Sequence, residues 1–417
     1  MSKEGKLGTA IPGKEGGAKM PWREASPMTE RIRFVLDHKL GVYTMTELCH
    51  RYGVSRKTGY KWLRRFEDDG FDGLRDRSRR PHSCPHRTPD ECVEAIIEKK
   101  KRHPTWGAKK IVPRLKKRHP HLTWPAISTG SAILERHGLV KPKRRSTKRG
   151  HPGRPDTPMD RPNAIWTIDY KGQFKTKNGL YCYPLTVADG HSRFLLGCQG
   201  YLSPLQVNTK KTMTAIFREF GLPDIIRSDN GTPFASNAIG RISRLSAWWI
   251  RLGVYPELIE PAHPEQNGRH ERMHRTLKAE TARPPAGNLS AQQRRFNCFR
   301  SEYNEERPHE ALGQETPASV YRPSDRPFPE KEPDIEYPGH YEVRRVSRNG
   351  GIRWHFNWVN VSHVLEEEYV GLEEIDDGLW NVYFGPVWLG RFNEKELKIE
   401  DALGRKRRRK VLPMYQE

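Results

Sequence analysis

Alternating strand and helix patterns between Asn163 and Tyr321 constrain the fold of this chain more than any other feature. AIWTIDY, PDIIRSD and VYPELIE are short apolar runs typical of buried strands. LYCYPLTVADG and HSRFLLGCQGY predict a hairpin across Asp189 and Gly190, a favoured two-residue turn. Amphipathic helices are predicted for NTKKTMTAIFREFG, ISRLSAWWIRLG, NGRHERMHRTLKAET and SAQQRRFNCFRSEYNEE. The alternation predicts an α/β domain over residues 163–322.

Two helices separated by a tight turn are predicted at residues 27–67, after a Gly- and Lys-rich arm at residues 1–26. In MTELCHRYGVSRKTGYKWLRRF, Thr46 and Ser55 are the expected helix caps and Gly53 the turn, and the second helix is expected to end at Phe66. This is a helix-turn-helix pattern, whose second helix enters a major groove. Gly59 departs from the pattern, because an aliphatic residue is usual at that inward position.

Basic residues on the second of these helices are candidate DNA contacts: Arg56, Lys57, Lys61 and Arg64. The alternative is an ordinary helical hairpin with a basic face. A second helical block at residues 89–140 contains HPTWGAKKIVPRL and predicts another helix-turn-helix or winged-helix domain, with Lys109 and Lys110 as further candidates. Two such domains in tandem would recognise a longer DNA site than one.

Segments rich in Pro and Arg predict irregular connections at residues 68–88 and 141–162. The second segment is either a solvated linker or an extended strand that follows phosphates or a minor groove, and the two are compatible. Its candidate contacts are Arg144, Arg145 and Arg154. A linker at residues 323–340 leads to short strand patterns at residues 341–400, which predict a small β-barrel, and residues 401–417 form a basic tail.

The net charge of +23 lies mostly near the N-terminus. Residues up to Asp160 contain 37 Lys and Arg against 18 Asp and Glu, a net of +19, which is typical of a nucleic-acid-binding surface. No run approaches the ~18 apolar residues of a membrane-spanning helix. The first 26 residues lack a signal-peptide core, and the six cysteines are too scattered for a disulfide scaffold. Membrane and secreted classes are disfavoured, and a polyanion is the expected partner.

Three carboxylates in the α/β domain have settings that favour a shared site. Asp169 follows Ile168 on the first strand, Asp229 closes the strand DIIRSD, and Glu271 lies in the first turn of the helix that begins at Asn267. Carboxylates at the ends of neighbouring strands meet in one crevice, and a helix N-terminus favours an ionised acid. Oxygen-only ligation indicates Mg²⁺ rather than zinc, and two such ions about 3.5–4 Å apart catalyse phosphodiester chemistry.

Helical spacing places two cations beside Glu271. Arg275 and Lys278 follow it at i+4 and i+7, on the same face, where they would contact phosphates, while Met273 and Leu277 are expected to pack inward. The alternative for any single acid is a helix cap or a surface position. Asp189, in particular, is most simply a turn residue.

Five ordered motifs resemble one family, the bacterial insertion-sequence transposases with a retroviral-integrase-type catalytic core. The matching segments are WTIDYKG, VADGHSRF, IIRSDNGTPF, HPEQNGRHERMHRTLK and YNEERPHEALGQETPASVY. GVSRKTGYKWLRRF, HPTWGAKK and the order of the predicted domains are also similar to this family. One departure is the spacing of 41 residues between Asp229 and Glu271, which is longer than in many integrase-type cores. The extra length is expected around SNAIGRISRLSAWWIR.

The resemblance implies a multidomain fold with helix-turn-helix modules, a central ribonuclease-H-like core and a C-terminal SH3-like β-barrel. It implies a DDE triad at Asp169, Asp229 and Glu271, which would serve as both catalytic residues and metal ligands. Magnesium would be the cofactor, with manganese able to substitute. The implied activity is a DNA transposase that binds terminal inverted repeats, frees 3′-OH ends and joins them to target DNA.

The partners implied by the resemblance are double-stranded DNA, at the element's ends and at the target, and further copies of the chain in a dimer or larger synaptic complex. An element-encoded accessory protein is a further candidate partner, and a membrane is not expected. The implied location is the bacterial cytoplasm, in association with the nucleoid.

Three alternatives are weighed against this interpretation. His82, Cys84, His86 and Cys92 crowd into one segment, but a paired CxxC is missing, so a plain linker is favoured over zinc. A catalytically silent, transposase-derived DNA-binding regulator would be indicated by loss of one acid, and all three acids are present. A ribonuclease-H-like nuclease that cuts without joining has little need for two sequence-recognition domains.

Overall fold

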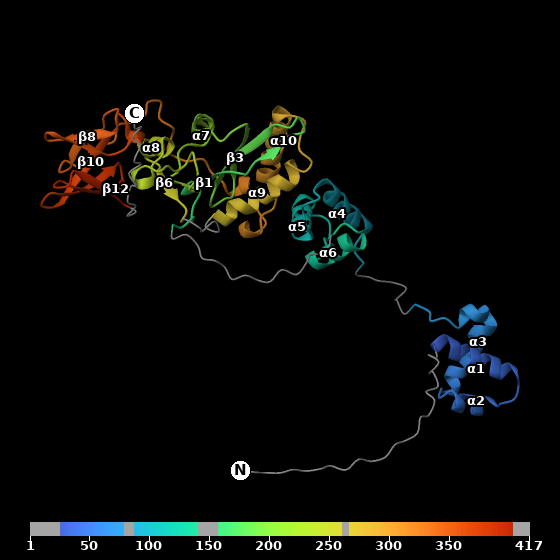
Figure 1. The fold of residues 1–417 in the computed structure, drawn as a ribbon. Coiled ribbons are helices and arrows are strands. Elements are labelled where there is room, and N and C mark those ends of the chain that lie inside the picture. Colours follow the sequence, from blue (N-terminus) through green and yellow to red (C-terminus); the bar gives the residue numbers. More distant parts are fainter. Residues whose placement is uncertain (1–25, 79–86, 141–156, 261–266, 403–417) are drawn as a thin grey trace, which may run out of the picture. The chain divides into compact units, whose positions relative to one another are not determined.

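The computed structural model describes residues 26–78, 87–140, 157–260 and 267–402. The chain divides into two compact units, Met1–Arg87 and Thr88–Glu417. Within the described ranges, no helix combines the length and apolar character needed to cross a membrane. The structure confirms a helical N-terminal region followed by an α/β core and a C-terminal β-rich domain (Figure 1).

Three helices form the first unit: α1 (Pro27–Lys39), α2 (Met45–Arg51) and α3 (Arg56–Gly73). Ser55 caps α3 as predicted. The cap of α2 is Thr44 rather than Thr46, because the Thr44 hydroxyl accepts from the N–H of Glu47 while the Glu47 carboxylate accepts from the N–H of Thr44.

Helix α3 extends beyond its predicted end at Phe66. Gly70 adopts a φ of +61°, which kinks the helix and lets the chain continue to Gly73. The ring of Phe71 then packs edge-on against Phe66, with 5.1 Å between the ring centroids. This contact attaches the added turn to the helix.

Gly59 lies inside the three-helix core, where an aliphatic residue was expected. The space is already filled: a Cβ atom on Gly59 would lie 2.7 Å from the Sγ of Cys49 and 2.8 Å from the Cζ of Phe34. The ring of Phe34, on α1, therefore occupies the volume that a larger side chain on α3 would need.

We expect Gly59→Leu to destabilise this unit by about 1–3 kcal/mol, because overpacking forces its neighbours off their rotamers. Hydrogen exchange measured by mass spectrometry should be faster than in the unaltered protein in residues 26–78 and unchanged in the α/β core. Gly107→Ala is the matched control, since a Cβ there meets no atom within 4 Å. Unchanged exchange in Gly59→Leu would contradict this account of the packing.

Three further helices open the second unit: α4 (Asp90–Arg102), α5 (Ala108–Arg118) and α6 (Ile127–Arg136). They pack around a buried cluster that includes Ile96, Trp106, Ile111 and Leu134. The apolar positions follow the helical period, so each helix directs one stripe inward.

A six-stranded sheet forms the centre of the α/β core, in the order β2-β3-β1-β5-β6, with β4 also paired to β3. The strands are β1 (Ile165–Tyr170), β2 (Phe174–Lys175), β3 (Tyr181–Asp189), β4 (Leu195–Tyr201), β5 (Ile225–Ser228) and β6 (Tyr255–Leu258). Strand β1 is parallel to β5 and antiparallel to β3, and β5 is parallel to β6.

Helices cover both faces of this sheet. Helices α7 (Gln206–Phe220) and α8 (Arg244–Arg251) share one buried cluster with Trp166 and Ile168 of β1. Helices α9 (Gly268–Thr281) and α10 (Leu289–Ser301) share another with Ala188 of β3 and Leu195 of β4. Successive strand side chains point to opposite faces, so Thr167 and Asp169 point away from the α7–α8 layer. The core continues through η3 (Glu302–Glu306), η4 (Glu310–Leu312) and α11 (Pro317–Val320).

The β3–β4 hairpin is confirmed, but its predicted two-residue turn is wrong. The connection spans residues 190–194, and the N–H of Asp189 pairs with the carbonyl of Phe194. The buried Asp189 carboxylate accepts from the N–H of Asn163 at 2.8 Å and from the N–H and hydroxyl of Ser192 at 2.7 and 2.6 Å. Asp189 therefore organises a longer loop and ties it to the chain entering β1.

The C-terminal domain is a five-stranded antiparallel sheet in the order β13-β12-β11-β10-β7, accompanied by the hairpin β8–β9. Its strands are β7 (Glu342–Arg345), β8 (Gly351–Trp354), β9 (Asn357–Asn360), β10 (Tyr369–Asp376), β11 (Leu379–Phe384), β12 (Val387–Asn393) and β13 (Lys398–Asp401). A short η5 (His363–Leu365) precedes β10. Among the described strands, β7 and β13 lie at opposite edges and do not pair to close a barrel.

Helix α8 and the preceding η1 (Ile239–Arg241) contribute to the core of this C-terminal domain. Ile239, Ile242, Ala247 and Ile250 share one buried cluster with Val382, Phe384 and Phe392. Gly385 permits the close approach, because a Cβ there would lie 2.8 Å from the Cγ2 of Ile250. Helix α8 is therefore buried on two sides, between the core sheet and the C-terminal sheet (Figure 1).

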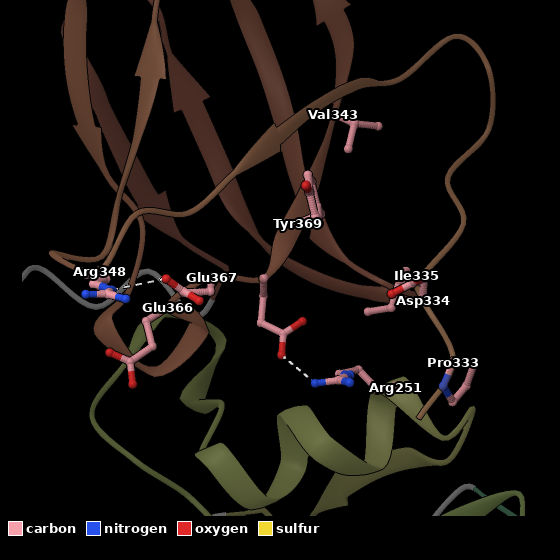
Figure 2. Close-up of a pocket in the computed structure, with 10 residues that line it drawn as sticks. Arg251, Pro333, Asp334, Ile335, Val343, Arg348, Glu366, Glu367 and Tyr369 are labelled. Carbon is pink, nitrogen blue, oxygen red and sulfur yellow. Dashed lines mark hydrogen bonds and ion pairs between the residues drawn. The ribbon is translucent and has the colours of Figure 1, made fainter. Parts of the chain in front are cut away.

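A cleft of about 960 Å³ opens beside α8, under the C-terminal strands (Figure 2). Arg251 lies on its floor and pairs with Glu368 at 3.0 Å and with Glu332 at 2.8 Å. The lining is rich in acids, including Asp334, Glu366 and Glu367. Such a lining repels phosphate, and its residues come from neither β1, β5 nor α9, so this cleft is separate from the predicted catalytic residues.

Candidate active site

The parallel pairing of β1 and β5 brings Asp169 and Asp229 to one edge of the sheet. Thr167 pairs with Arg227. Asp169 follows two residues later on β1, and Asp229 follows two residues later, directly after the end of β5. Two bonds hold the turn after β5: the N–H of Gly231 donates to the Asp229 carboxylate at 3.2 Å, and the Asn230 amide donates to a main-chain carbonyl at 2.7 Å. Neighbouring parallel strands lie about 4.8 Å apart, so the two aspartates lie at the same end of neighbouring strands.

Helix α9 supplies the third carboxylate. Its buried face carries Met273 and Leu277, as predicted, and its exposed face carries Glu271, Arg275 and Lys278. Glu271 lies in the first turn of α9, near enough to the strand ends for its charge to act on Asp169. The predicted acid and its two neighbouring cations thus occupy one side of this helix.

The charges of these acids act on one another. Burial, the charge of Asp229 and, more weakly, that of Glu271 raise the pKa of Asp169 to about 7, against the opposing charge of Lys171. Burial also raises the pKa of Asp229, against the hydrogen bond from Gly231. Carboxylates that oppose one another's ionisation are stabilised by a bound cation, so the donor set fits a hard divalent ion.

Two buried histidines of α9 lie beside Asp169 and contact strands β1 and β3. The ring of His270 contacts the hydroxyl of Thr167 through Nδ1 at 2.8 Å and that of Thr186 through Nε2 at 2.7 Å. The Nε2 of His274 contacts the same Thr186 hydroxyl at 2.6 Å, and its Nδ1 faces the Oδ2 of Asp169 at 3.4 Å. Donor atoms of Asp169, His270 and His274 lie within 4.8 Å of one another, an arrangement that could hold a metal ion.

Both rings are neutral at physiological pH. Burial, reinforced by Lys171, lowers the pKa of His270 to about 3. Burial also lowers the pKa of His274, with His270 and Lys171 adding to the effect. Neutral imidazoles act as hydrogen-bond relays or as metal ligands.

The sequence analysis did not identify His270, His274, Thr186 or Lys171 as parts of the site. The available signal was the helical period, since residues 270, 274, 277 and 281 form one inward stripe that starts beside Glu271. A histidine in such a stripe usually packs without reacting, and Thr186 becomes relevant only once β3 pairs with β1. Lys171 acts through its charge on Asp169, His270 and His274.

The predicted DNA contacts on α3 form an exposed stripe. Arg56, Lys57, Lys61 and Arg64 are all exposed, and Tyr60 lies among them with 52% of its surface accessible. Below the stripe, the Lys61 ammonium lies 4.6 Å from the ring centroid of the buried Trp62. The arrangement is that of a basic helix face with an aromatic side chain at its centre.

Lys109 and Lys110, by contrast, are engaged within the second unit. Lys109 pairs with Glu310 at 3.2 Å, and Lys110 donates to the carbonyl of Pro308. Burial, aided by Arg307, lowers the pKa of Lys110 to about 8. Arg144, Arg145 and Arg154, like three of the four zinc candidates, lie outside the described residues.

The HPTWG segment joins the α4–α6 domain to the α/β core. His103 stacks on Trp106, with 4.2 Å between ring centroids, and its Nδ1 lies 2.6 Å from the carboxylate of Glu302. Lys99 pairs with Glu306 at 3.2 Å. These contacts attach the HPTWG segment to the residues that directly follow α10. This structural role is additional to any role in DNA recognition.

Comparison with known families assigns both kinds of domain. Models described as an integrase core domain match residues 159–264 and 252–317. A helix-turn-helix domain matches residues 30–82, and a homeodomain-like domain matches residues 58–134. The chain contains an integrase core preceded by DNA-binding helical domains, and its resemblance to the DDE transposases and integrases with a ribonuclease-H-like core is confirmed.

Curated relatives match part of the chain. The Gag-Pol polyprotein of baboon endogenous virus (strain M7) is 32% identical over 119 residues, which is 28% of this chain and 6% of that protein. The Pol polyprotein of radiation murine leukemia virus (strain Kaplan) is 32% identical over 120 residues, 28% of this chain and 19% of that protein. The chain thus spans less than a fifth of either relative.

Solved structures with a similar chain include the HTLV-2 integrase catalytic core domain in complex with magnesium, in its trimeric form. It is 17% identical, with 39% of this chain and 99% of that chain covered and a TM-score of 0.32. A simian T-cell lymphotropic virus intasome chain is 16% identical, with 70% and 97% covered and a TM-score of 0.34.

Proposed function

We propose that this protein is a DNA transposase that frees the 3′-OH ends of a mobile element and joins them to target DNA. The observation that supports the proposal is the effect of the Asp229 and Glu271 charges on Asp169, within residues matched by integrase core models. In this proposal the three acids are catalytic residues and hold divalent metal, with Mg²⁺ as the physiological ion and Mn²⁺ as a substitute.

The chemistry consists of two in-line displacements at phosphorus. In the first, water attacks a phosphodiester at the element's end, the P–O3′ bond breaks, and the departing oxygen becomes a free 3′-OH. In the second, that hydroxyl attacks a target phosphodiester, so that one P–O bond forms as another breaks. Bound metal would lower the pKa of the attacking hydroxyl group and neutralise charge on the leaving oxygen.

Residues of the chain would position the DNA for these steps. Arg275 and Lys278 lie on the side of α9 that carries Glu271, where they can donate to the phosphates flanking the scissile bond. No protein nucleophile is required, since the attacking oxygen comes from water or from the DNA itself. His270 and Thr186 hold α9 against the strand that carries Asp169.

The remaining domains would recognise and align the DNA. The two helical domains, proposed at residues 27–67 and 89–140, would bind the terminal inverted repeats, and the basic linker between them and the core would follow the backbone. The C-terminal domain would act as an SH3-like module that holds DNA. Two ends must meet, so a dimer or larger complex is proposed, acting at the bacterial nucleoid with or without an accessory protein.

A strand-transfer assay tests the proposal. The full chain, a duplex that carries one end of the mobile element, Mg²⁺ and a supercoiled plasmid should yield end-nicked DNA and then plasmid joined to the end duplex. Omission of Mg²⁺ should stop both products. Nicking without any joined product, over a series of end sequences, would instead indicate a nuclease.

Replacement of Arg56 and Lys57 by Ala should weaken binding to the element's end by about 10–100-fold, because each lost base contact costs about 1–3 kcal/mol. Titration of end duplex against random duplex, followed by fluorescence anisotropy, measures the difference. Arg77→Ala is a control, since Arg77 lies beyond the end of α3 and its guanidinium pairs with Asp69 at 2.8 Å. Equal weakening on both duplexes would assign these residues to phosphate contacts alone.

A further inference from the structure

The buried contact between Asp169 and His274 is too long for the bond that an acid and a histidine usually form. The Nδ1 of His274 lies 3.4 Å from the Oδ2 of Asp169, whereas a charge-assisted N–H···O bond measures about 2.7–2.9 Å. The two side chains are 2% and 22% exposed, so this is not a loose surface pair.

The hydrogen bonds around the His274 ring limit which of its two nitrogens can carry the proton. Its Nε2 is occupied by the hydroxyl of Thr186, which also contacts the Nε2 of His270. A hydroxyl donates one hydrogen and accepts through two lone pairs. If Thr186 donates to His270 or to the carbonyl of Asp169, which lies 3.2 Å away, the Nε2 of His274 must be the donor. The neutral ring then presents a bare lone pair at Nδ1.

Only one alternative reverses this arrangement. If Thr186 donates to the Nε2 of His274, the proton lies on Nδ1 and points at Asp169. That arrangement predicts the short hydrogen bond that the 3.4 Å separation does not provide. With the Asp169 carboxylate ionised, as it is when it binds a metal ion, two of the three consistent proton arrangements place a nitrogen lone pair opposite a carboxylate oxygen, with no hydrogen between them.

From this geometry we infer that the Nδ1 of His274 is a ligand of the divalent metal bound by Asp169. Adjacent ligands of an octahedral ion, each at about 2.1 Å, lie roughly 3 Å apart, close to the observed separation. His270 is not a ligand, because hydroxyls at 2.8 and 2.7 Å occupy both of its ring nitrogens. The network of Thr167, His270 and Thr186 instead fixes the His274 ring, as outer partners of metal-bound histidines do.

A nitrogen ligand has a consequence for metal choice. Carboxylate and water ligands suit Mg²⁺, whereas imidazole favours transition-metal ions. A site with one imidazole should therefore bind Mn²⁺ more tightly than Mg²⁺ by a larger margin than a site of carboxylates alone. This inference rests on the proposed function, because it assigns a further ligand to the same metal.

Electron spin-echo spectroscopy of the full chain loaded with Mn²⁺ tests the assignment without measuring activity. The unaltered protein should show modulation from a directly bound ¹⁴N, and labelling its histidines with ¹⁵N should replace that frequency. His274→Asn should lose the modulation and raise the Mn²⁺ dissociation constant by at least about 10-fold. If that variant does not fold, the inference is decided by whether the modulation is kept in His270→Asn and lost in Asp169→Asn.

Two matched variants locate the signal. His270→Asn should keep the ¹⁴N modulation, because that ring acts through Thr186 rather than on the ion. Asp169→Asn should lose it, which separates this site from other histidines that bind Mn²⁺. Modulation that persists in His274→Asn, or is absent from the unaltered protein, would overturn the inference.

The result is independent of the transposase assay. Strand transfer by a protein whose Mn²⁺ shows no ¹⁴N coupling would contradict the His274 assignment and leave the proposed function standing. A clear ¹⁴N signal in a protein that never nicks or joins DNA would support the His274 assignment and contradict the proposed function.

Discussion

Asp169→Asn is expected to lower the rates of end cleavage and strand transfer by at least about 10³-fold, because the proposed mechanism uses this carboxylate to hold metal against the scissile phosphate. Asp229→Asn and Glu271→Gln should have the same effect. Binding to the element's end should remain almost unchanged, since the proposed recognition residues lie on α3. Single-turnover cleavage of a labelled end duplex, paired with anisotropy titration, measures both quantities.

Asp224→Asn is the matched control for these variants. Asp224 precedes β5, at the opposite end from Asp229, and pairs with Arg161 at 2.6 Å and with Arg326 at 3.5 Å. It should retain near wild-type cleavage. Joining at wild-type rate by any of the three acid variants would show that the proposed triad is wrong.

Asp189→Ala should lower the free energy of unfolding of the α/β core by about 4 kcal/mol, because it leaves buried N–H groups of Asn163 and Ser192 without an acceptor. Urea denaturation followed by circular dichroism measures the loss. The more exposed Asp224→Ala should cost no more than about 1 kcal/mol, as surface ion pairs do. Equal stability of the two variants would contradict the structural role of Asp189.

These two experiments separate acids that look alike in the sequence. Asp169 and Asp189 both lie at or near the end of a strand-like run, a few residues or fewer before a glycine. Only the three-dimensional structure shows that Asp189 is saturated by three donors, whereas Asp169 faces another acid and an imidazole nitrogen. An acidic residue at a strand end therefore predicts a catalytic or metal site only when the groups that contact its carboxylate are also known.

Periodicity made much of the core predictable. The strands around Asp169 and Asp229 are short apolar runs, and the exposed face of α9 follows from a spacing of 3.6 residues. The inward face was harder to interpret, because the histidines at 270 and 274 resemble ordinary packing residues until β3 brings Thr186 beneath them. Pairing between distant strands is not encoded in local spacing.

Contacts between domains also lay beyond the sequence. Lys110 resembles an exposed DNA-binding residue, yet it lies against the core and donates to Pro308. The amphipathic pattern of α8 showed one apolar face, while the structure buries Trp249 against the core sheet and Ile250 against the C-terminal domain. A helix covered on both sides is recognised only when both neighbours are known.

The double burial of α8 limits how this protein can be recombined with its relatives. A chimera that imports residues 341–401 alone would set a foreign sheet on Ile239, Ala247 and Ile250, whose shapes match the native one. A functional exchange therefore needs two separate segments: the C-terminal strands must be transferred together with residues 239–250. These residues lie in the sequence between Asp229 and Glu271, two of the proposed catalytic acids. Any change of the C-terminal domain thereby reaches into the segment that connects Asp229 to Glu271.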